Sequence, residues 1–447
     1  MTPPASRCEP PDPRAIHSSG QLTVLNSCGQ LTYQQHILGD SLLCDSGYSC
    51  PSSRAGGRAL PTDLWQKLSA DTSAPRYRLG TLRAVSPDAT LRRVRPLLRR
   101  AGITRLADVT GLDWVGLPVF QAMRPNSRVL SVSQGKGLTR EQGQVSALME
   151  ALEGFHTEEI PRPSVRETVG NMRRRLGYDA YALPLSRPSL LGDAVALDWV
   201  PATELSSGAA SWVPRQLCEL NACVEDRVHV PLFRASSNGL AGGNTVGEAL
   251  LHGLCEVIER DCCARYGEAR FDPKRCVEPE SVRPRLGRHL LGLMSRAGMD
   301  MRIVDLTGPT GLPCFEVWLD HPDGPTVTVG SGCHPNRLTA LVRAITEAAQ
   351  SRLAYISGSR DDIPRAIYRA PTVRAPSHPR GPLELQGHFA DTPTVRAGGF
   401  SAQVREVAGR VRAFTGMSPV AVDLTRRDFG IPVVFVVAPG LMPPEPE

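Results

Sequence analysis

The sequence has few aromatic residues, no long apolar run and no paired-cysteine motif. Aromatic residues make up only 5% of the chain, which argues against stacking platforms for single-stranded nucleic acid. Helix-turn-helix and zinc-finger spacings are missing too, so we expect no nucleic-acid partner. No apolar run could span a bilayer, and the N-terminus lacks a basic region followed by a hydrophobic one. We therefore expect a cytoplasmic protein without a membrane segment.

The 12 cysteines are not spaced as metal ligands. None forms a Cys-x-x-Cys pair, so a structural zinc site has no support in the sequence. Cys255, Cys262 and Cys263 fall within a predicted helix, where cysteine commonly acts as a small buried hydrophobic residue. Reduced thiols fit this pattern best.

Composition indicates a folded chain with an atypical start. Hydrophobic residues make up 41% and charged residues 21%, which excludes wholesale disorder. Residues 1–58 are rich in Ser, Pro, Gly and Cys, and we interpret them as a disordered or partner-facing extension, or as a mis-assigned start. Part of the net charge of +6 lies in the arginine-rich segment 86–100. Ser86 and Pro87 at its beginning predict the start of a helix. Its arginines suit a solvated helix face or a contact with phosphate or an acidic partner.

The most informative stretch, residues 236–265, is a polar glycine-rich loop followed by a predicted amphipathic helix. Thr245 is predicted to cap this helix, with Glu248 three residues later completing a capping box. Apolar residues recur at helical spacing and define a buried face. A separate face carries Glu248, His252, Glu256 and Glu259. Because like charges on one stripe repel, we expect positive charge opposite these acids.

A second predicted helix, residues 139–156, repeats the arrangement. Ser146, Glu150 and Glu153 fall at i, i+4 and i+7 beside its apolar stripe. A single Glu-x-x-Glu pair is usually a solvated helix face. Two such pairs, each after a glycine-bearing loop, favour a cation site, and carboxylate oxygens are ligands that suit Mg²⁺ together with substrate phosphates.

Two further features bear on phosphate binding. The predicted loop around Lys136 is not a Walker A motif, because Leu130 stands where the first glycine belongs and Gly137 follows the lysine. Lys136 therefore either meets a phosphate in some other way or is solvated. A third predicted helix, residues 339–356, places Arg343, Glu347 and Gln350 on one face, as an internal ion pair or as a ligand contact.

Three segments resemble, in order, the signature regions of the YcaO family: SQGKGLTREQGQVSALMEALE, SSNGLAGGNTVGEALLHGLCEVIERD and LVRAITEAAQSRLAYISGSRDD. The resemblance extends from about Tyr77 to the C-terminus, so we assign residues 59–447 to a YcaO domain. It implies an α+β fold of mixed, mostly antiparallel sheets flanked by helices around a site for ATP and Mg²⁺. Family members use ATP to activate peptide backbone amides and make azolines, amidines or thioamides.

The resemblance also assigns site residues. The family's metal ligands match Glu150, Glu153, Glu256 and Glu259, and Glu150 and Glu256 also border the nucleotide. Further nucleotide-lining positions match Ser146, Asn244, Glu248, Arg260, Arg343 and Glu347. Arg83 and Thr90 stand where the family tends to place a lysine and a serine near the phosphates and the base. No catalytic nucleophile is singled out, and His252 is either a supporting or proton-transferring group or a structural histidine.

Two departures from the family pattern shape the functional expectation. Gly154 stands where many members have arginine, and the chain ends in PPEPE instead of an alternating Pro-x-Pro-x-Pro tail. The segment before the first signature is most similar to members that work with a TfuA partner and are associated with thioamides. We therefore expect thioamide formation in a peptide or protein substrate, with a TfuA-type partner and a homodimer. Azoline or amidine formation is the alternative, and a non-catalytic nucleotide-binding scaffold is the alternative of another class.

Overall fold

This computed structural model describes residues 25–26, 63–160, 164–221, 231–321, 327–363, 368 and 384–442. The predicted extension over residues 1–58 lies outside this range except for Leu25–Asn26, which form strand β1. Most of the helices and strands that the sequence predicts lie inside it.

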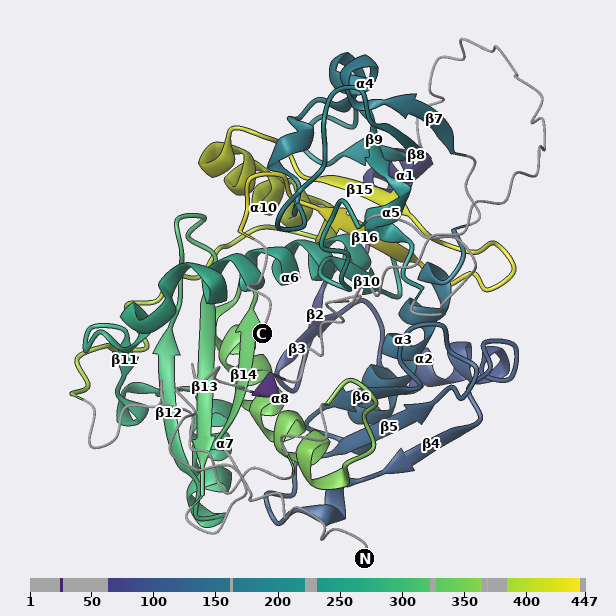
Figure 1. The fold of residues 1–447 in the computed structure, drawn as a ribbon. Helices are drawn as coiled ribbons and strands as arrows, with labels where there is room; N and C mark the ends of the chain where they lie inside the picture. The colour runs from purple at the N-terminus through teal and green to yellow at the C-terminus, as the bar shows by residue number, and fades with distance from the viewer. Residues whose placement is uncertain are drawn as a thin grey trace, which may run out of the picture.

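Three main sheets and one hairpin make up the β structure (Figure 1). The five-stranded sheet has the order β1, β14 (Thr328–Cys333), β13 (Cys314–Asp320), β12 (Asp300–Asp305), β11 (Cys276–Val277). The six-stranded sheet has the order β10 (Leu240–Gly242), β16 (Val433–Val437), β15 (Val420–Asp423), β8 (Ala196–Glu204), β7 (Val165–Thr168), with β9 (Ala210–Pro214) paired to β8. The three-stranded sheet is β4 (Arg105–Asp108), β5 (Val119–Met123), β6 (Val132–Lys136), and the hairpin is β2 (Arg76–Arg78) with β3 (Thr81–Arg83). Only the β1–β14 pairing is parallel among the described strands, which confirms the predicted α+β fold with mostly antiparallel sheets.

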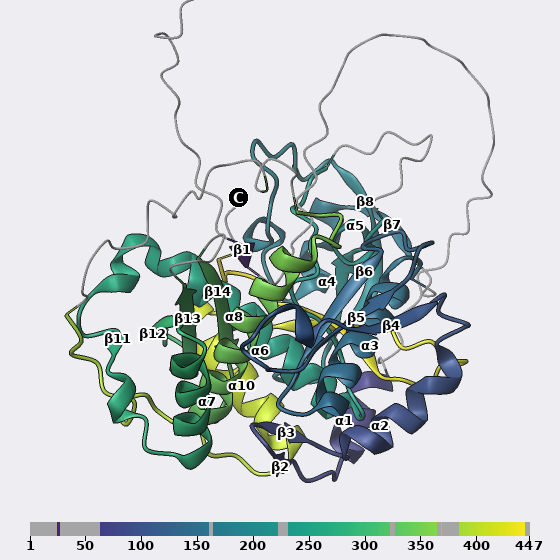
Figure 2. The same cartoon turned by 90° about the horizontal axis from the view of Figure 1, so that it is seen from below.

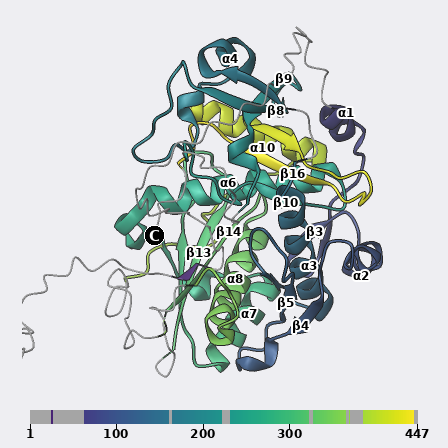
Figure 3. The same cartoon turned by 45° about the vertical axis from the view of Figure 1, so that its right-hand side comes forward.

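Three long helices organise these sheets. Helix α3 (Arg140–Thr157) packs on the three-stranded sheet, and α8 (Arg337–Ser357) packs on β13 and β14. Helix α6 (Val246–Tyr266) crosses the middle of the molecule between the six-stranded sheet and the five-stranded sheet (Figures 1 and 3). Viewed from below, α3 and α8 lie on the near side of α6 (Figure 2). The remaining α-helices are α1 (Asp63–Ala70), α2 (Pro87–Val94), α4 (Val169–Leu176), α5 (Arg215–Cys218), α7 (Arg285–Arg296) and α10 (Phe400–Thr415).

Side-chain caps fix where these helices begin. The hydroxyl of Thr139 accepts from the amide of Gln142 at the start of α3, and that of Thr245 accepts from the amide of Glu248 at the start of α6, both at 3.2 Å. Such a bond satisfies one of the backbone donors left free at a helix start. Ser86 caps α2, with Pro87 as the first helical residue, as the sequence predicts.

Two glycines let the helices sit directly on their strands. A Cβ at Gly135 of β6 would lie 1.9 Å from the backbone nitrogen of Ala147 in α3. A Cβ at Gly330 of β14 would lie 2.1 Å from the backbone nitrogen of Ala348 in α8. Both distances are far shorter than van der Waals contact, so neither position has room for a side chain.

The core contains two of the three helix cysteines that the sequence predicts to be buried, whereas Cys263 is partly exposed. Cys255 and Cys262 are buried on α6, and all seven cysteines in the part of the chain that the structure describes are free thiols. The described helices include none with the length and apolar character needed to cross a membrane.

Replacing Gly330 by alanine tests the direct contact between β14 and α8. We expect the Gly330→Ala variant to lose roughly 1–3 kcal/mol of unfolding free energy, because a backbone atom cannot move aside as a flexible side chain can. Urea unfolding followed by circular dichroism measures it. The matched control is Gly409→Ala in α10, where nothing lies within 4 Å of the added carbon; this change should stabilise the protein by about 0.5–1 kcal/mol. Equal stability of Gly330→Ala and wild type would contradict the contact.

Candidate active site

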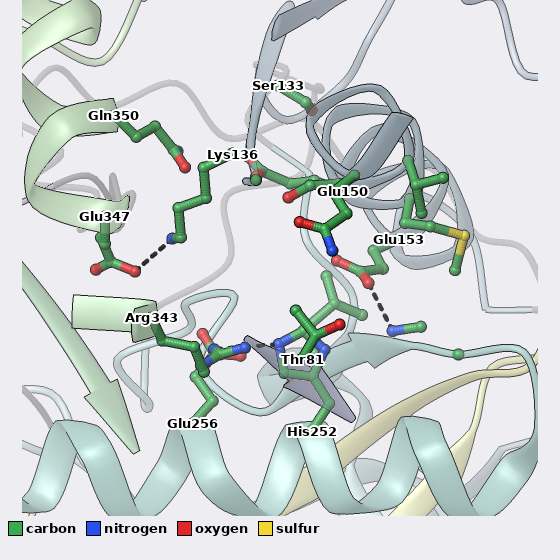
Figure 4. Close-up of a pocket in the computed structure, with 18 of the residues that line it drawn as sticks. Thr81, Ser133, Lys136, Glu150, Glu153, His252, Glu256, Arg343, Glu347 and Gln350 are labelled. Atoms are coloured by element: carbon green, nitrogen blue, oxygen red, sulfur yellow. Dashed lines mark hydrogen bonds and ion pairs between the residues drawn. The ribbon is translucent and has the colours of Figure 1, made fainter. Parts of the chain in front are cut away.

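Glutamates from three helices converge on one pocket. Helix α3 supplies Glu150 and Glu153, α6 supplies Glu256 and Glu259, and α8 supplies Glu347 (Figure 4). The pocket has a volume of about 270 Å³, and strand β6 and the β2–β3 hairpin complete its wall. Two Glu-x-x-Glu pairs that are about 100 residues apart in the sequence therefore face the same space.

Backbone amides hold three of these carboxylates in place. Glu153 accepts a hydrogen bond of 2.6 Å from the amide of Gly242, at the end of β10. Glu259 accepts one of 2.8 Å from the amide of Cys333 in β14, and Glu150 accepts a longer one of 3.4 Å from Gln134 in β6. Each acid thus joins its helix to a strand of a different sheet, so the positions of the acids depend on the whole fold.

The enclosed position of the acids changes their acidity. Loss of bulk water raises the pKa of Glu153 and of Glu256 to about 8, and neighbouring carboxylates add to both shifts. Loss of water also raises the pKa of Glu150 and Glu259. Glu259 is buried, whereas Glu150, Glu153 and Glu256 are partly exposed because they face the pocket. Near neutral pH such carboxyls favour either a proton or a bound cation.

Cationic side chains balance part of this charge. Lys136 Nζ lies 2.6 Å from Glu347 Oε2, and Arg260 Nη2 lies 3.3 Å from Glu259 Oε1. Although burial opposes it, the positive charge of Lys136 and Arg260 lowers the pKa of Glu347 to about 2. Lys136 ends strand β6 instead of standing in a loop, so the predicted loop is wrong there, and its ion pair rules out the solvated alternative.

Arg343 and Glu347 share one helix face, and the positive charge of Arg343 lowers the pKa of Glu347. Glu347 also forms an ion pair with Lys136 from the neighbouring sheet. Arg343 Nη2 lies 3.4 Å from His252 Nε2, so both side chains line the pocket. Loss of water and the charge of Arg343 hold the pKa of His252 well below its usual range, which keeps the imidazole neutral.

Glu248 organises the end of the pocket next to the hairpin. Its carboxylate lies 3.0 Å from Arg83 Nη1 and accepts hydrogen bonds from the amide of Ala84 and from Asn244 Nδ2. Thr90 in turn donates a hydrogen bond of 2.8 Å to Asn244 Oδ1. The reciprocal half of the predicted capping box is therefore wrong, because Glu248 binds the hairpin instead of turning back to Thr245.

The pocket brings together every site residue that the sequence predicts. Lining residues include Arg83, Thr90, Lys136, Ser146, Glu150, Glu153, Asn244, Glu248, Glu256, Glu259, Arg260, Arg343 and Glu347. Sequence reasoning assigned no role to Ser133, Arg360 or Gln350, which also line it. Each carried a signal, because Ser133 and Arg360 fall within the first and third signature segments and Gln350 shares the helix face of Arg343 and Glu347.

The charges suit Mg²⁺ held jointly with phosphates. Among the described residues, His, Cys, Asp and Glu form no group of three or more that could hold a metal ion by itself. Mg²⁺ typically binds through one or two carboxylates and completes its shell with water and substrate phosphates. Pairs of glutamates on opposite walls, with raised pKa values and cations beside them, fit that mode of binding.

These features fit a site for ATP and Mg²⁺, and residues 134–442 match the family described as "YcaO cyclodehydratase, ATP- and Mg2+-binding". The chain belongs to the YcaO family. An uncharacterized protein of Mycobacterium tuberculosis (strain ATCC 25618 / H37Rv) is 38% identical over 84% of this chain and 85% of the relative. A protein of Rhizobium leguminosarum bv. trifolii, described as lying in the tfuA 3′ region, is 39% identical over 64% of this chain and 70% of its own length.

Solved structures share the fold. YcaO from Methanopyrus kandleri, bound with AMPPCP and Mg²⁺, has a TM-score of 0.65 at 22% identity, over 84% of this chain and 99% of that one. A heterocyclase in complex with substrate and cofactor has a TM-score of 0.69 at 22% identity, over 81% of this chain and 53% of that one. At this identity the comparison establishes the YcaO-like fold and not the substrate.

The raised pKa of Glu256 predicts a pH-dependent stability. A carboxyl whose pKa rises from 4.5 to about 8 on folding stabilises the folded state less and less as pH increases between those values. In metal-free buffer, Glu256→Gln should therefore be more stable than wild type by roughly 1–3 kcal/mol at pH 8, with a much smaller gain at pH 5. Urea unfolding in EDTA measures the difference. The exposed Glu406→Gln serves as control, and a gain that does not grow with pH would contradict the assignment.

Proposed function

We propose that this chain uses ATP and Mg²⁺ to phosphorylate the oxygen of a peptide backbone amide, and that the favoured product is a thioamide. The observation that carries the proposal is the convergence of two Glu-x-x-Glu pairs from α3 and α6 on one pocket. Enclosed carboxylates destabilise the folded state unless a bound cation compensates their charge. This disfavours the alternative of a scaffold protein, which has no need to hold so much negative charge together.

The residues around the pocket divide into three proposed roles. Glu150, Glu153, Glu256 and Glu259 hold the metal ions, and Lys136, Arg260 and Arg343 place positive charge towards the phosphates. Arg83, Thr90, Ser146, Asn244 and Glu248 hold the nucleoside end, where hydrogen bonds already join Glu248 to the hairpin. When bound, Mg²⁺ neutralises the phosphates and aligns them for transfer.

The proposed reaction replaces oxygen by sulfur without a redox change. A sulfide equivalent adds to the amide carbon, the resulting oxyanion takes the terminal phosphoryl group of ATP, and the amide oxygen leaves as part of inorganic phosphate. The products are the thioamide, ADP and phosphate, with the proton of the sulfide passing to phosphate. Arg343 and Lys136 stabilise the negative charge that develops in the pocket. His252 lines the same pocket, but its lowered pKa makes the imidazole a poor proton acceptor, so phosphate is the acceptor.

Two features favour a thioamide over an azoline. The segment before the first signature is most similar to members that work with a TfuA partner, and a relative lies in the tfuA 3′ region. These also support a TfuA-type partner, and we expect the chain to act as a homodimer. In the alternative, azoline formation, a Cys, Ser or Thr of the substrate supplies the nucleophile; the fold shared with a heterocyclase is compatible with it.

Binding of Mg-ATP tests the carboxylate site. Isothermal titration calorimetry should show binding to the wild type that EDTA abolishes. The double variant Glu256→Gln/Glu259→Gln should bind at least about 100-fold more weakly, equivalent to roughly 2.8 kcal/mol, because the variant lacks one pair of metal ligands. Glu406→Gln on α10 should bind like wild type. Undiminished binding by the double variant would refute the site.

The product distinguishes the two chemistries. Incubation with ATP, Mg²⁺, radiolabelled sulfide, a TfuA-type partner and a peptide extract of the producing cells should place label in peptides that gain mass by exchanging oxygen for sulfur. Glu256→Gln/Glu259→Gln should give no label. Peptides that lose one water molecule without label would instead identify azoline formation.

A further inference from the structure

One end of the pocket carries two uncharged polar side chains with no hydrogen-bond partner in the part of the chain that the structure describes. Gln350, one turn after Glu347 on α8, is 3% exposed, and its side-chain amide makes no hydrogen bond to any residue that the structure describes. Ser133 on β6 is 8% exposed, and its hydroxyl likewise has no partner there. Buried polar groups are nearly always hydrogen-bonded, so unpartnered ones that line a pocket indicate a missing ligand.

The position of this end separates it from the nucleoside end. Figure 4 shows Gln350 and Ser133 beyond Lys136 and Glu150, on the far side from Thr81 and the hairpin. At the hairpin end, Glu248, Asn244 and Thr90 are already joined by hydrogen bonds. The nucleoside end is thus already joined by hydrogen bonds, whereas Gln350 and Ser133, next to Lys136 and Glu150, keep their hydrogen-bonding groups available for a ligand.

The backbone around these groups ties them to the carboxylates. Ser133 precedes Gln134, whose amide donates to Glu150. The carboxamide of Gln134 is fully buried, and neither of its polar atoms has a partner among the described residues. Lys136, two residues further along the strand and so on the same face, bonds Glu347 of α8. Gln134 itself does not line the pocket, whereas Ser133 does.

We propose that Gln350 and Ser133 form the subsite for the backbone amide of the substrate peptide, an inference that rests on the proposed function. A carboxamide carries an acceptor and two donors, so it can pair with both the N–H and the C=O of a peptide unit. Groups next to Glu150 and Glu347 place that unit beside the phosphate ligands, as transfer to its oxygen requires. Neutral donors suit an uncharged amide, and no side chain of the substrate is needed for this recognition.

Saturation-transfer NMR with N-acetylglycine N-methylamide tests the subsite. This probe has two backbone amides and no side chain, and it is added with Mg²⁺ and a non-hydrolysable ATP analogue. Gln350→Met keeps the length of the side chain and removes its hydrogen bonds, so it should weaken probe binding about tenfold. Ser133→Ala should weaken it as well and serves as the second variant in case Gln350→Met does not fold. The exposed Gln66→Met is the matched control.

Calorimetry with Mg-ATP on the same variants separates the two proposals. Intact Mg-ATP binding by Gln350→Met and Ser133→Ala, together with loss of the probe signal, supports the subsite. Equal probe signals in wild type and both variants, or no signal in the wild type, overturn it and leave the proposed function standing. Loss of Mg-ATP binding in Gln350→Met would make Gln350 a nucleotide contact and also overturn it. Absence of Mg-ATP binding in the wild type would refute the proposed function itself.

Discussion

The enclosure of like charges around one pocket is the constraint on which the rest of the structure depends. Six glutamates from α3, α6 and α8 line a volume of about 270 Å³ together with cations that include Lys136, Arg260 and Arg343. Such an arrangement opposes folding unless the surrounding structure holds the charges in place. Backbone amides from β10, β14 and β6 do so, and each belongs to a different sheet. The three sheets therefore act together to hold the acids in place, and cations that bind between the acids reduce the repulsion among them.

The local parts of this arrangement could be predicted from the sequence. The periodicity after Thr139 and Thr245 identified α3 and α6, the cap of α6 and the stripes that carry the two Glu-x-x-Glu pairs, because these features depend on residues within a few turns of each other. Resemblance to the YcaO signatures then joined the two pairs in one site. The family match over residues 134–442 confirms the family, and the antiparallel sheets confirm the fold.

The long-range pairings could not be predicted. Lys136 and Glu347 are 211 residues apart, and Arg83 and Glu248 are 165 apart, so no periodic pattern links them. The capping-box pattern at Thr245 pointed the wrong way, because the hairpin offers Glu248 the guanidinium of Arg83 and the amide of Ala84. The helical spacing placed Gln350 on the same face as Arg343 and Glu347 but assigned it no role. Its proposed role rests on the absence of hydrogen bonds to the described residues, which only the structure reveals.

The glycines under α3 and α8 have a further consequence. Gly135 and Gly330 bring strand and helix backbones into direct contact. The distance between strand and helix at these points is therefore set by backbone atoms and not by the volumes of side chains. Apolar substitutions elsewhere in the core can then change how stable the protein is while the opposing acids keep their spacing. Core substitutions that adapt the protein to another temperature or solubility can then accumulate in evolution while the geometry of the pocket is retained.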